Sequence, residues 1–473
     1  MPFSGVRATP KTGATVAKRK VLFICHNHPK VRPGGAEAYA YELHCALRDS
    51  SEWEPTFVAR TGPPLSPTGR PHPGTCFSPV DGASGEYFVY GDDYDFDWLF
   101  GTMHHSKELY TRHFREFLLA LSPDVVHFQH TLFLGYDLLR EVRNTLPDVP
   151  ILYTLHEFLP ICHNNGQMIR TMDGDPCTHD SPRRCNECFP AITPQTFFLR
   201  KRFIQAQMST VDRFIVPSAL LRDRFVDWGL PPEKVKLEEY GRRIASAQPE
   251  PDDREQRDRL GFFGQLSPYK GIDVLLEAMR ELHREDRREA GTDLANAVAE
   301  RIGGSRPRET ASARPQLRIH GANLDLQEHA FRDKFDRLLD ETRDRVTLVG
   351  SYKRDRLSEL MAGVDWVVVP SIWWENSPLV IQEAFAHGKP VICSDIGGMA
   401  EKVTDGVSGL HFRVGDSLSL ANAIRRAVDS PALWDALRAG IPRVHTMDDH
   451  VPVVVGMYER LLEERAVEGV AAP

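Results

Sequence analysis

Short apolar runs alternate with amphipathic segments along the first half of the chain. The run VLFIC at 21–25 has the character of a buried strand, and the segment after Gly34 and Gly35 repeats apolar residues every three to four positions. That period predicts a helix with one apolar face, formed by Ala36, Tyr39, Ala40, Leu43 and Leu47. Further β-rich runs follow at TFVAR, DVVHFQH, ILYTLHE and RFIVPS. Strands that alternate with helices predict a parallel sheet covered on both faces.

The same alternation starts again at LGFFG, residues 260–264. The helix predicted next has one apolar face, formed by Ile272, Leu275, Leu276, Met279 and Leu282. The runs LRIHG, VTLVG, WVVVP and VICSD follow as strands, and VVGMYERLLEER is predicted to be a final helix. The fold class is therefore α/β, with two doubly wound domains and a cleft between them. Ligands of such folds bind at the carboxyl ends of the strands.

Breaks in this alternation divide the chain into segments. The predicted segments are a flexible tail, an N-terminal domain, a polar Pro-bearing linker, a C-terminal domain, and a C-terminal helix with its tail, at residues 1–19, 20–241, 242–258, 259–445 and 446–473. Residues 61–97 lack an apolar period and are predicted to be a surface insertion. Residues 284–315, rich in Arg, Glu and Ala, are predicted to be a solvated insertion. Residues 161–190 form a third, cysteine-rich insertion.

Composition narrows the class of protein. A chain of 473 residues is too long to fold around a single hydrophobic core. A content of 41% hydrophobic and 26% charged residues is typical of a soluble globular protein. The formal net charge of -8 argues against nucleic acid as a partner. No apolar run reaches the roughly 18 to 20 residues that a membrane span needs. The basic N-terminal stretch lacks the apolar region of a signal peptide, so we expect a cytoplasmic protein.

The stretch WWENSPLVIQEAF holds two glutamates, Glu375 and Glu383, separated by seven residues. Ser377 is a suitable N-cap and Pro378 a suitable first helical residue, and Gly388 is a suitable stop. A helix N-terminus carries free N–H groups and partial positive charge, so it binds phosphate. Glu375 lies just before this helix start and Glu383 lies inside the helix, so the two carboxylates bracket a predicted phosphate site.

This spacing fits a nucleotide-sugar better than a glycosidic bond. Glycosidase carboxylates flank one bond at about 5 to 9.5 Å, with one kept protonated, and nothing in the spacing imposes that geometry. A nucleotide diphosphate sugar has hydroxyl groups on both sides of its phosphates, which suits two ionised acceptors. The alternative is a capped helix whose glutamates are solvated.

Two other short motifs add to this one. Lys270 and Gly271 follow a Gly-rich strand and precede a helix, where a lysine can reach phosphate oxygens. Gly34 and Gly35 open the first predicted helix, and glycines let a backbone approach a ligand closely. Each motif alone is weak, because a strand, a loop and a helix with a Lys or a Gly pair are common.

In combination and in this order, the motifs GG, K-G and E-x7-E resemble the retaining GT-B glycosyltransferases of family 4 over essentially the whole chain. The run HGKPVICSDIGGMAEKVTDGVSGLHF behind the glutamates and the run IVPSALLRDRFVDWGLPPEKVKLEEYG before the linker support the resemblance. It implies a GT-B fold, with two Rossmann-like domains: one on the acceptor side at the N-terminus and one that binds the nucleotide-sugar at the C-terminus.

The resemblance also implies residue roles. Glu375 would hold donor-sugar hydroxyls, Glu383 the ribose hydroxyls, and Lys270 the leaving diphosphate; His156 would lie near the reacting centre. The implied catalytic residues are Glu375, His156 and Lys270, and the donor-binding residues are Gly34, Gly35, Gln265, Lys270, Glu375, Asn376, Ser377, Leu379, Val380 and Glu383. Gln265 departs from the family, which usually has Arg there, and Arg242 or Arg243 would have to supply the missing charge.

The implied reaction moves a sugar from a nucleotide diphosphate sugar, UDP- or GDP-linked, to an acceptor hydroxyl with retention of configuration. The acceptor, a glycan or a lipid-linked molecule among the options, would enter from the N-terminal domain, and contact with a membrane surface would be peripheral. No divalent metal or other cofactor is needed for catalysis in this scheme.

Four cysteines crowd the third insertion. Cys162, Cys177, Cys185 and Cys188 have spacings of 14, 7 and 2 residues, and the C-x2-C end is typical of zinc knuckles. The segment is rich in Gly, Asp and Pro, so a structural zinc would explain its order. An Fe–S cluster, disulfides and free thiols are the alternatives, and His163 and His179 are alternative ligands for one position of the zinc site.

Other functions fit the sequence less well. The acidic runs DYDFD at 93–97 and DGD at 173–175 resemble the metal-binding motif of the other glycosyltransferase fold, but the second half of the chain does not. A dinucleotide oxidoreductase is disfavoured because no G-x-G-x-x-G follows the first strand. A nucleotide-sugar epimerase on the same scaffold and a non-catalytic nucleotide-sugar-binding protein remain as alternatives.

Overall fold

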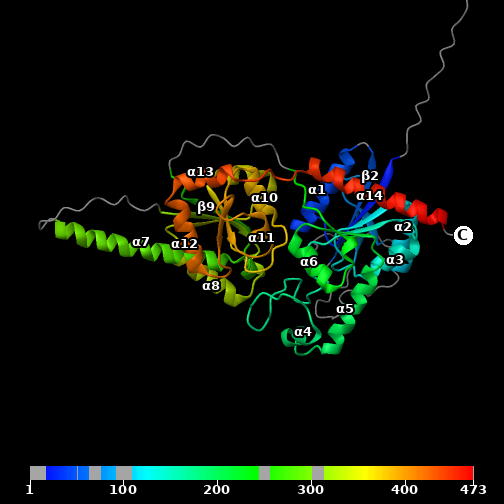
Figure 1. Cartoon of the computed structure of the whole chain (residues 1–473), viewed down its shortest axis with the longest axis horizontal. Coiled ribbons are helices and arrows are strands. Elements are labelled where there is room, and N and C mark those ends of the chain that lie inside the picture. Colours follow the sequence, from blue (N-terminus) through cyan, green and yellow to red (C-terminus); the bar gives the residue numbers. More distant parts are fainter. Residues whose placement is uncertain are drawn as a thin grey trace, which may run out of the picture.

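The computed structural model describes residues 18–32, 34–50, 52–62, 76–91, 109–243, 256–300 and 314–471. These residues form two α/β domains side by side (Figure 1). The N-terminal domain has an eight-stranded sheet in the order β3-β4-β2-β1-β5-β6-β7-β8, and the C-terminal domain has a six-stranded sheet in the order β11-β10-β9-β12-β13-β14. Both doubly wound domains and all the strands predicted from apolar runs are confirmed.

The N-terminal sheet is parallel except at its edge, where β3 pairs antiparallel with β4. Its strands are β1 (Arg19–Cys25), β2 (Trp53–Thr61), β3 (Phe77–Pro79), β4 (Glu86–Tyr90), β5 (Val125–Phe128), β6 (Ile151–Thr154), β7 (Arg213–Val216) and β8 (Val235–Leu237). Its helical elements are α1 (Gly35–Asp49), η1 (Leu109–Phe114), α2 (Arg115–Leu121), α3 (Asp137–Thr145), α4 (Pro182–Cys188), α5 (Pro194–Met208), α6 (Ala219–Trp228) and η2 (Pro232–Lys234).

The C-terminal sheet is parallel throughout. Its strands are β9 (Arg259–Gln265), β10 (Gln316–Ala322), β11 (Val346–Gly350), β12 (Trp366–Val369), β13 (Val391–Ser394) and β14 (Gly409–Phe412). Its helical elements are η3 (Pro268–Lys270), α7 (Ile272–Glu300), η4 (Leu324–Leu326), α8 (His329–Thr342), η5 (Arg354–Arg356), α9 (Leu357–Ala362), α10 (Leu379–Ala386), α11 (Gly397–Lys402), α12 (Ser417–Val428) and α13 (Pro431–Ala439).

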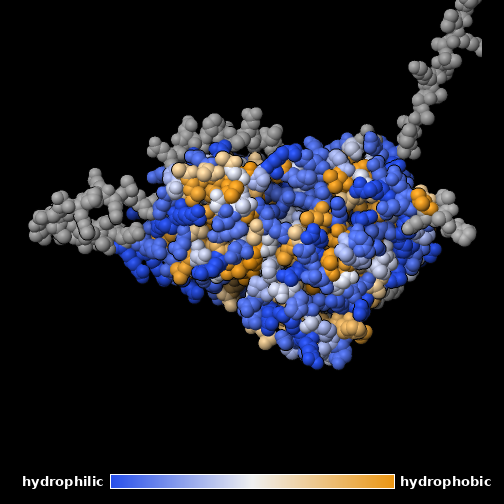
Figure 2. Space-filling view, in the orientation of Figure 1, coloured by the Kyte–Doolittle hydropathy of each residue, from blue (hydrophilic) through white to orange (hydrophobic). Residues whose placement is uncertain are grey.

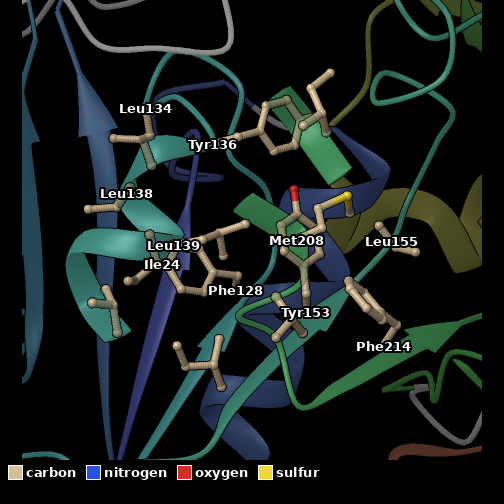
Figure 3. Packing of buried hydrophobic residues seen from close by; sticks show 14 of the residues in the cluster. Ile24, Phe128, Leu134, Tyr136, Leu138, Leu139, Tyr153, Leu155, Met208 and Phe214 are labelled. Carbon is tan, nitrogen blue, oxygen red and sulfur yellow. The ribbon is translucent and has the colours of Figure 1, made fainter. Parts of the chain in front are cut away.

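Both faces of each sheet are buried, which is why the central strands are mainly apolar. All four residues of β5, β6, β12 and β13 are buried. In the N-terminal domain, Ile24 and Phe128 pack against Leu138 and Leu139 of α3 on one face (Figure 3). A separate cluster that contains Phe23 lies on the other face. The candidate site therefore lies at the carboxyl ends of the strands and not on a face of either sheet.

Two of the predicted insertions contain regular secondary structure that the sequence patterns did not predict. Strands β3 and β4 lie within 61–97 and extend the sheet, because Glu86–Tyr90 pairs with Phe57–Thr61 of β2. Residues 284–300 continue helix α7. Most of the predicted linker and DYDFD at 93–97 lie outside the described residues, as do residues 1–17.

The C-terminal helix α14 (Met447–Ala471) returns to the N-terminal domain and lies across it (Figure 1). Tyr458 and Met457 are buried in the same cluster as Phe23 of β1, and the Tyr458 hydroxyl is 2.7 Å from His127 Nδ1. The chain therefore passes between the domains twice. The two passages run side by side, with a bridge between Arg242 and Thr446.

Among the described residues, no helix has the length and apolar character required to cross a membrane. The face of the molecule in Figure 2 is mainly hydrophilic, with its apolar residues in small separate groups.

Tyr458 tests the docking of α14. We expect Tyr458→Ala to destabilise the N-terminal domain by about 3–5 kcal/mol, because it leaves an aromatic-sized cavity. Tyr458→Phe should cost about 1 kcal/mol, because it removes only the hydrogen bond to His127. Hydrogen exchange of peptides from β1 and β5 would measure both losses, with β9 and β12 as internal controls. Equal, small effects of the two substitutions would contradict the packing described for α14.

Candidate active site

The loop between β12 and α10 carries the E-x7-E stretch. Helix α10 begins at Leu379, and Pro378 is its N-cap, with an extended backbone and no side-chain capping bond. The expectation that Ser377 is the N-cap was therefore wrong by one residue, because the proline itself takes the extended cap conformation. Gly388 follows the helix with φ +63°, as predicted for its stop. The side-chain oxygen of Ser377 is buried and has no hydrogen-bond partner.

Glu375 lies 6% exposed at the carboxyl end of β12, just before α10. Its Oε1 atom accepts bonds from Lys270 Nζ at 2.5 Å, Ser371 Oγ at 2.7 Å and Trp373 Nε1 at 2.9 Å. Lys270 Nζ also lies over the Trp373 ring, 5.5 Å from its centroid. A buried carboxylate requires such donors, and here a lysine, a hydroxyl and an indole supply them. The structure thus brings together Lys270 and Glu375, which are 105 positions apart in the chain.

Gly271 explains how Lys270 reaches this position. Its φ of +63° is left-handed, and a Cβ atom there would collide with the carbonyl oxygen of Pro370. The turn that ends η3 therefore packs directly on the backbone that leaves β12, and the Ile372 N–H donates to the Tyr269 carbonyl at 2.9 Å. The K-G motif holds the lysine against the loop that carries Glu375.

A glycine pair at the start of α11 supports the same loop from the other side. The Gly398 N–H donates to the Glu375 carbonyl at 2.5 Å, and a Cβ at Gly398 would collide with the Asn376 carbonyl. Gly397, with φ +61°, would place a Cβ 2.8 Å from the Glu375 carbonyl oxygen. This pair was part of the family-like run in the sequence, but no role was predicted for it.

Glu383 lies on α10 and meets a cluster of charges from both domains. Arg242 donates to its Oε1 at 2.7 Å and Arg354 donates to the same atom at 3.1 Å. Burial raises the pKa of Glu383 to about 7, with the nearby Glu42 adding to the rise and Arg354 opposing it. Arg242 also approaches Glu42 of α1 to 3.3 Å. The predicted carboxylate is thus present, within a network that sequence spacing did not show.

The N-terminus of α1 faces the N-terminus of α10. An added Cβ at Gly35 would be 3.8 Å from Leu379 Cδ1, so the GG motif of the N-terminal domain adjoins the first residue of the helix predicted to bind diphosphate. A Cβ at Gly34 would press on the Glu37 carboxylate. Asn376 also joins the domains, because its Nδ2 donates to the His156 carbonyl at 2.8 Å.

His156 follows β6 and is held on both ring nitrogens. Nδ1 is 2.5 Å from the Tyr240 hydroxyl and Nε2 is 3.2 Å from Gln129 Oε1. Burial, with His130 and other histidines nearby, lowers the pKa of His156 well below its usual value, so the ring is neutral. The structure therefore places His156 on the N-terminal side of the same interdomain region, as predicted, and as a neutral group.

The two arginines proposed to supply the charge of the family's missing Arg each pair with a carboxylate other than Glu375. Arg242 is at Glu383 and Glu42, and Arg243 pairs with Asp49 at the surface. Gln265 is exposed at the end of β9. Positive charge near the site thus gathers at the Glu383 end, through Arg242 and Arg354, while Lys270 is at the Glu375 end.

Comparison with known proteins covers both halves of the chain. Residues 33–237 match the model of Glycosyltransferase Family 4, and residues 245–444 match that of Glycosyl transferases group 1. The chain belongs to the group 1 glycosyltransferases of the GT-B fold. Each domain of this glycosyltransferase is therefore matched by one of the two models.

Relatives with curated names are matched over part of their length. D-inositol 3-phosphate glycosyltransferase 1 of Catenulispora acidiphila is 29% identical over 246 residues, 50% of this chain and 53% of the relative. The enzyme of the same name from Acidothermus cellulolyticus, without the numeral, is 28% identical over 272 residues, 54% of this chain and 55% of the relative. The chain spans about half the length of the curated relatives it matches.

Solved structures share the fold over nearly the whole chain. Sucrose-phosphate synthase from Thermosynechococcus elongatus has a TM-score of 0.65 at 18% identity, with 94% of this chain and 100% of that chain covered. Anabaena Alr3699/HepE in complex with UDP has a TM-score of 0.60 at 16% identity, with 93% and 100% covered. These likenesses confirm the GT-B fold predicted from the three motifs.

The N-terminal domain of this glycosyltransferase carries a second charged cluster that the sequence reasoning missed. His26 Nε2 lies 2.9 Å from Glu37, and His130 Nε2 lies 3.2 Å from Glu157. Burial disfavours the His26 cation, but the Glu37 carboxylate outweighs it and raises the pKa of His26 to about 10. The sequence does contain a signal for this cluster, because a histidine follows each of the neighbouring strands β1, β5 and β6. These histidines are His26, His130 and His156.

The cysteine-rich segment, residues 161–190, contacts the C-terminal domain. Trp374 Nε1 donates to the Cys177 carbonyl at 3.1 Å, which ties this segment to the loop of Glu375. Burial raises the pKa of the Cys162 thiol to about 12 and that of Cys185 to about 11. Cys162, Cys177, Cys185 and Cys188 are free thiols, and no three of them have sulfur atoms within 4.8 Å of one another. The zinc site on these residues stays a prediction.

The support from α11 can be tested with Gly398→Ala. The added methyl group must displace the Asn376 backbone, so we expect the C-terminal domain to lose about 1–3 kcal/mol of stability. Gly456→Ala in α14 is the matched control, because the nearest atom to its new Cβ is 3.7 Å away and alanine favours helix by up to about 1 kcal/mol. Urea unfolding measures both. If Gly398→Ala unfolds at the wild-type midpoint, the close packing of α11 on the loop is refuted.

Proposed function

We propose that this chain transfers a hexose from a nucleotide diphosphate sugar to an acceptor hydroxyl with retention of anomeric configuration. One observation carries the proposal: Lys270 and Glu375 meet beside the N-terminus of α10. A lysine and a helix N-terminus together favour a diphosphate, and a carboxylate beside them accepts bonds from sugar hydroxyls.

The order of groups along the site supports a donor laid over the start of α10. Glu375 would hold sugar hydroxyls, the N–H groups of Leu379 and Val380 with Ser377 would meet the diphosphate, and Glu383 would hold the ribose. The first N–H groups of a helix have no partner within it, and the buried Ser377 Oγ has none either. A nucleotide that spans α10 in this direction satisfies all of these groups at once.

Two comparisons favour UDP as the nucleotide and a polyol as the acceptor. The Anabaena neighbour is named as a complex with UDP, and the curated relatives are named for D-inositol 3-phosphate. In this chain, the acceptor would lie at the strand ends that carry His26–Glu37 and His130–Glu157. Carboxylates and imidazoles are suitable partners for several hydroxyl groups at once.

Retention follows if the acceptor attacks from the face on which the diphosphate leaves. The bond between the anomeric carbon and the phosphate oxygen breaks, the acceptor oxygen forms the new bond, and the leaving phosphate takes the acceptor's proton. Lys270 and the N–H groups of α10 stabilise the charge that develops on the diphosphate. The neutral ring of His156 would contribute no charge to the reaction.

The transfer reaction can be tested by a hydrolysis screen of UDP-, GDP- and ADP-sugars. We expect one UDP-sugar to be turned over, and Lys270→Ala to lower kcat by about 10²–10³-fold, the usual effect of removing one group that stabilises developing charge. Glu375→Ala should abolish turnover. The proposal fails if none of the nucleotide-sugars binds or is hydrolysed.

Binding measurements with Glu375→Ala separate the sugar from the diphosphate. The substitution frees Lys270 from its carboxylate partner, so affinity for UDP should stay equal or rise, while affinity for the UDP-sugar should fall toward that of UDP. Glu359→Gln, at an exposed pair with Arg356, is the control that should change neither affinity. An equal loss for both ligands would mean that Glu375 supports the loop and does not contact the sugar.

The ribose contact of Glu383 is tested with 2′,3′-dideoxy-UDP. The wild type should bind UDP at least about tenfold more tightly than the dideoxy analogue, because hydrogen bonds to a charged group contribute about 1.5–3 kcal/mol. Glu383→Gln should remove most of this difference in titration calorimetry. If the variant binds both ligands weakly but keeps the full ratio between them, Glu383 serves only to position Arg242.

A further inference from the structure

Three potential metal ligands converge where the chain passes between the domains. Glu238 follows β8 on the outward passage. On the return passage, His445 lies just before α14 and His450 lies near its start. Glu238 Oε1 is 3.1 Å from His445 Nε2 and 2.9 Å from His450 Nδ1. Within the described part of the chain, this is the only group of three His, Cys, Asp or Glu whose ligand atoms all lie within 4.8 Å of one another.

We propose that Glu238, His445 and His450 form a zinc site that joins the two interdomain passages. Two imidazoles and one carboxylate are a known ligand set for Zn²⁺, with a water or other ligand in the fourth position. Zinc bonds of about 2.0–2.2 Å to N and O place tetrahedral ligand atoms roughly 3.3 Å apart. The two measured separations are within a few tenths of an ångström of that value.

The surroundings of His450 match those of a metal ligand. Its ring is fully buried, and its other nitrogen, Nε2, lies 2.8 Å from the Tyr39 hydroxyl. A partner on the second ring nitrogen sets the tautomer and the ring orientation, as metal-binding histidines require. His445 is 28% exposed and lines a cavity between the domains with Glu239 and Lys402, so an ion could enter from that side.

The proposed site is connected to the donor site through a short stretch of backbone. The residues just after Glu238 contact α10, because Gln382 Nε2 donates to Glu239 Oε1 at 2.8 Å and to the Tyr240 carbonyl at 2.9 Å. The Tyr240 hydroxyl contacts His156, and Arg242 contacts Glu383. An ion that fixes Glu238 to the return passage would therefore fix the segment that holds α10 and His156.

The test measures zinc binding directly by the full-length protein. The protein is stripped with a chelator, dialysed and titrated with Zn²⁺ in the calorimeter, in a Cys185→Ser, Cys188→Ser background that removes two of the four predicted cysteine ligands. We expect one equivalent to bind. Glu238→Gln and His445→Gln, each in that background, should weaken binding at least about tenfold, since even outer partners of a metal contribute 10–100-fold.

His329→Gln is the matched control, because His329 is an exposed histidine paired with Asp333 on α8 and should leave binding unchanged. Cobalt substitution gives a second readout: a site of nitrogen and oxygen ligands lacks the strong thiolate-to-cobalt absorption that the cysteines would produce. The proposal is overturned if no zinc binds in the Cys185→Ser, Cys188→Ser background. Binding that Glu238→Gln and His445→Gln leave as tight as in the parent would overturn it equally. Neither readout depends on glycosyl transfer, so a failed activity assay does not affect the result.

Discussion

The burial of the Glu375 carboxylate is the constraint on which the rest of the site depends. A buried charge is tolerated only when hydrogen bonds and an opposite charge surround it, and Glu375 has Lys270, Ser371 and Trp373 on a single oxygen. Those donors must arrive from two loops at the carboxyl ends of β9 and β12. The tight turn at Gly271 follows from this requirement, because any side chain there would move the lysine away from the carboxylate.

The same loop also holds the two domains together. Asn376 donates to the backbone of His156, and Trp374 donates to the backbone of Cys177 in the cysteine-rich segment. Nearby, Glu401 of α11 accepts the first two N–H groups of α6, at 2.9 and 2.6 Å, so a carboxylate of one domain caps a helix of the other. A displacement of the Glu375 loop would therefore be felt at the acceptor side, which makes this loop a physical link between the two halves of the proposed reaction.

Sequence patterns predicted most of the strands and the two domains, and they indicated the main residues of the candidate site, because each depends on local periodicity or on a short motif. Glu375, Lys270 and Gly35 could be identified because each lies within a few residues of the end of a predicted strand or helix. The partners of Glu383 were not, because Arg242 and Glu42 come from the other domain and Arg354 from a separate loop. Strands β3 and β4 were missed for a related reason: they are short, lie among turn residues and gain their stability from pairing with β2.

The charges around the site also show what a donor must change on binding. Three basic side chains, Lys270, Arg242 and Arg354, pair with three acidic ones, Glu375, Glu383 and Glu42, so the charges balance above pH 7, where Glu383 is ionised. A diphosphate adds negative charge, and Gln265 offers none of the compensation an arginine would. In the proposed function, the diphosphate would therefore draw Lys270 away from Glu375, and that carboxylate would then need new donors. Sugar hydroxyls are suitable donors, so the sugar and the diphosphate would be bound more strongly together than either alone.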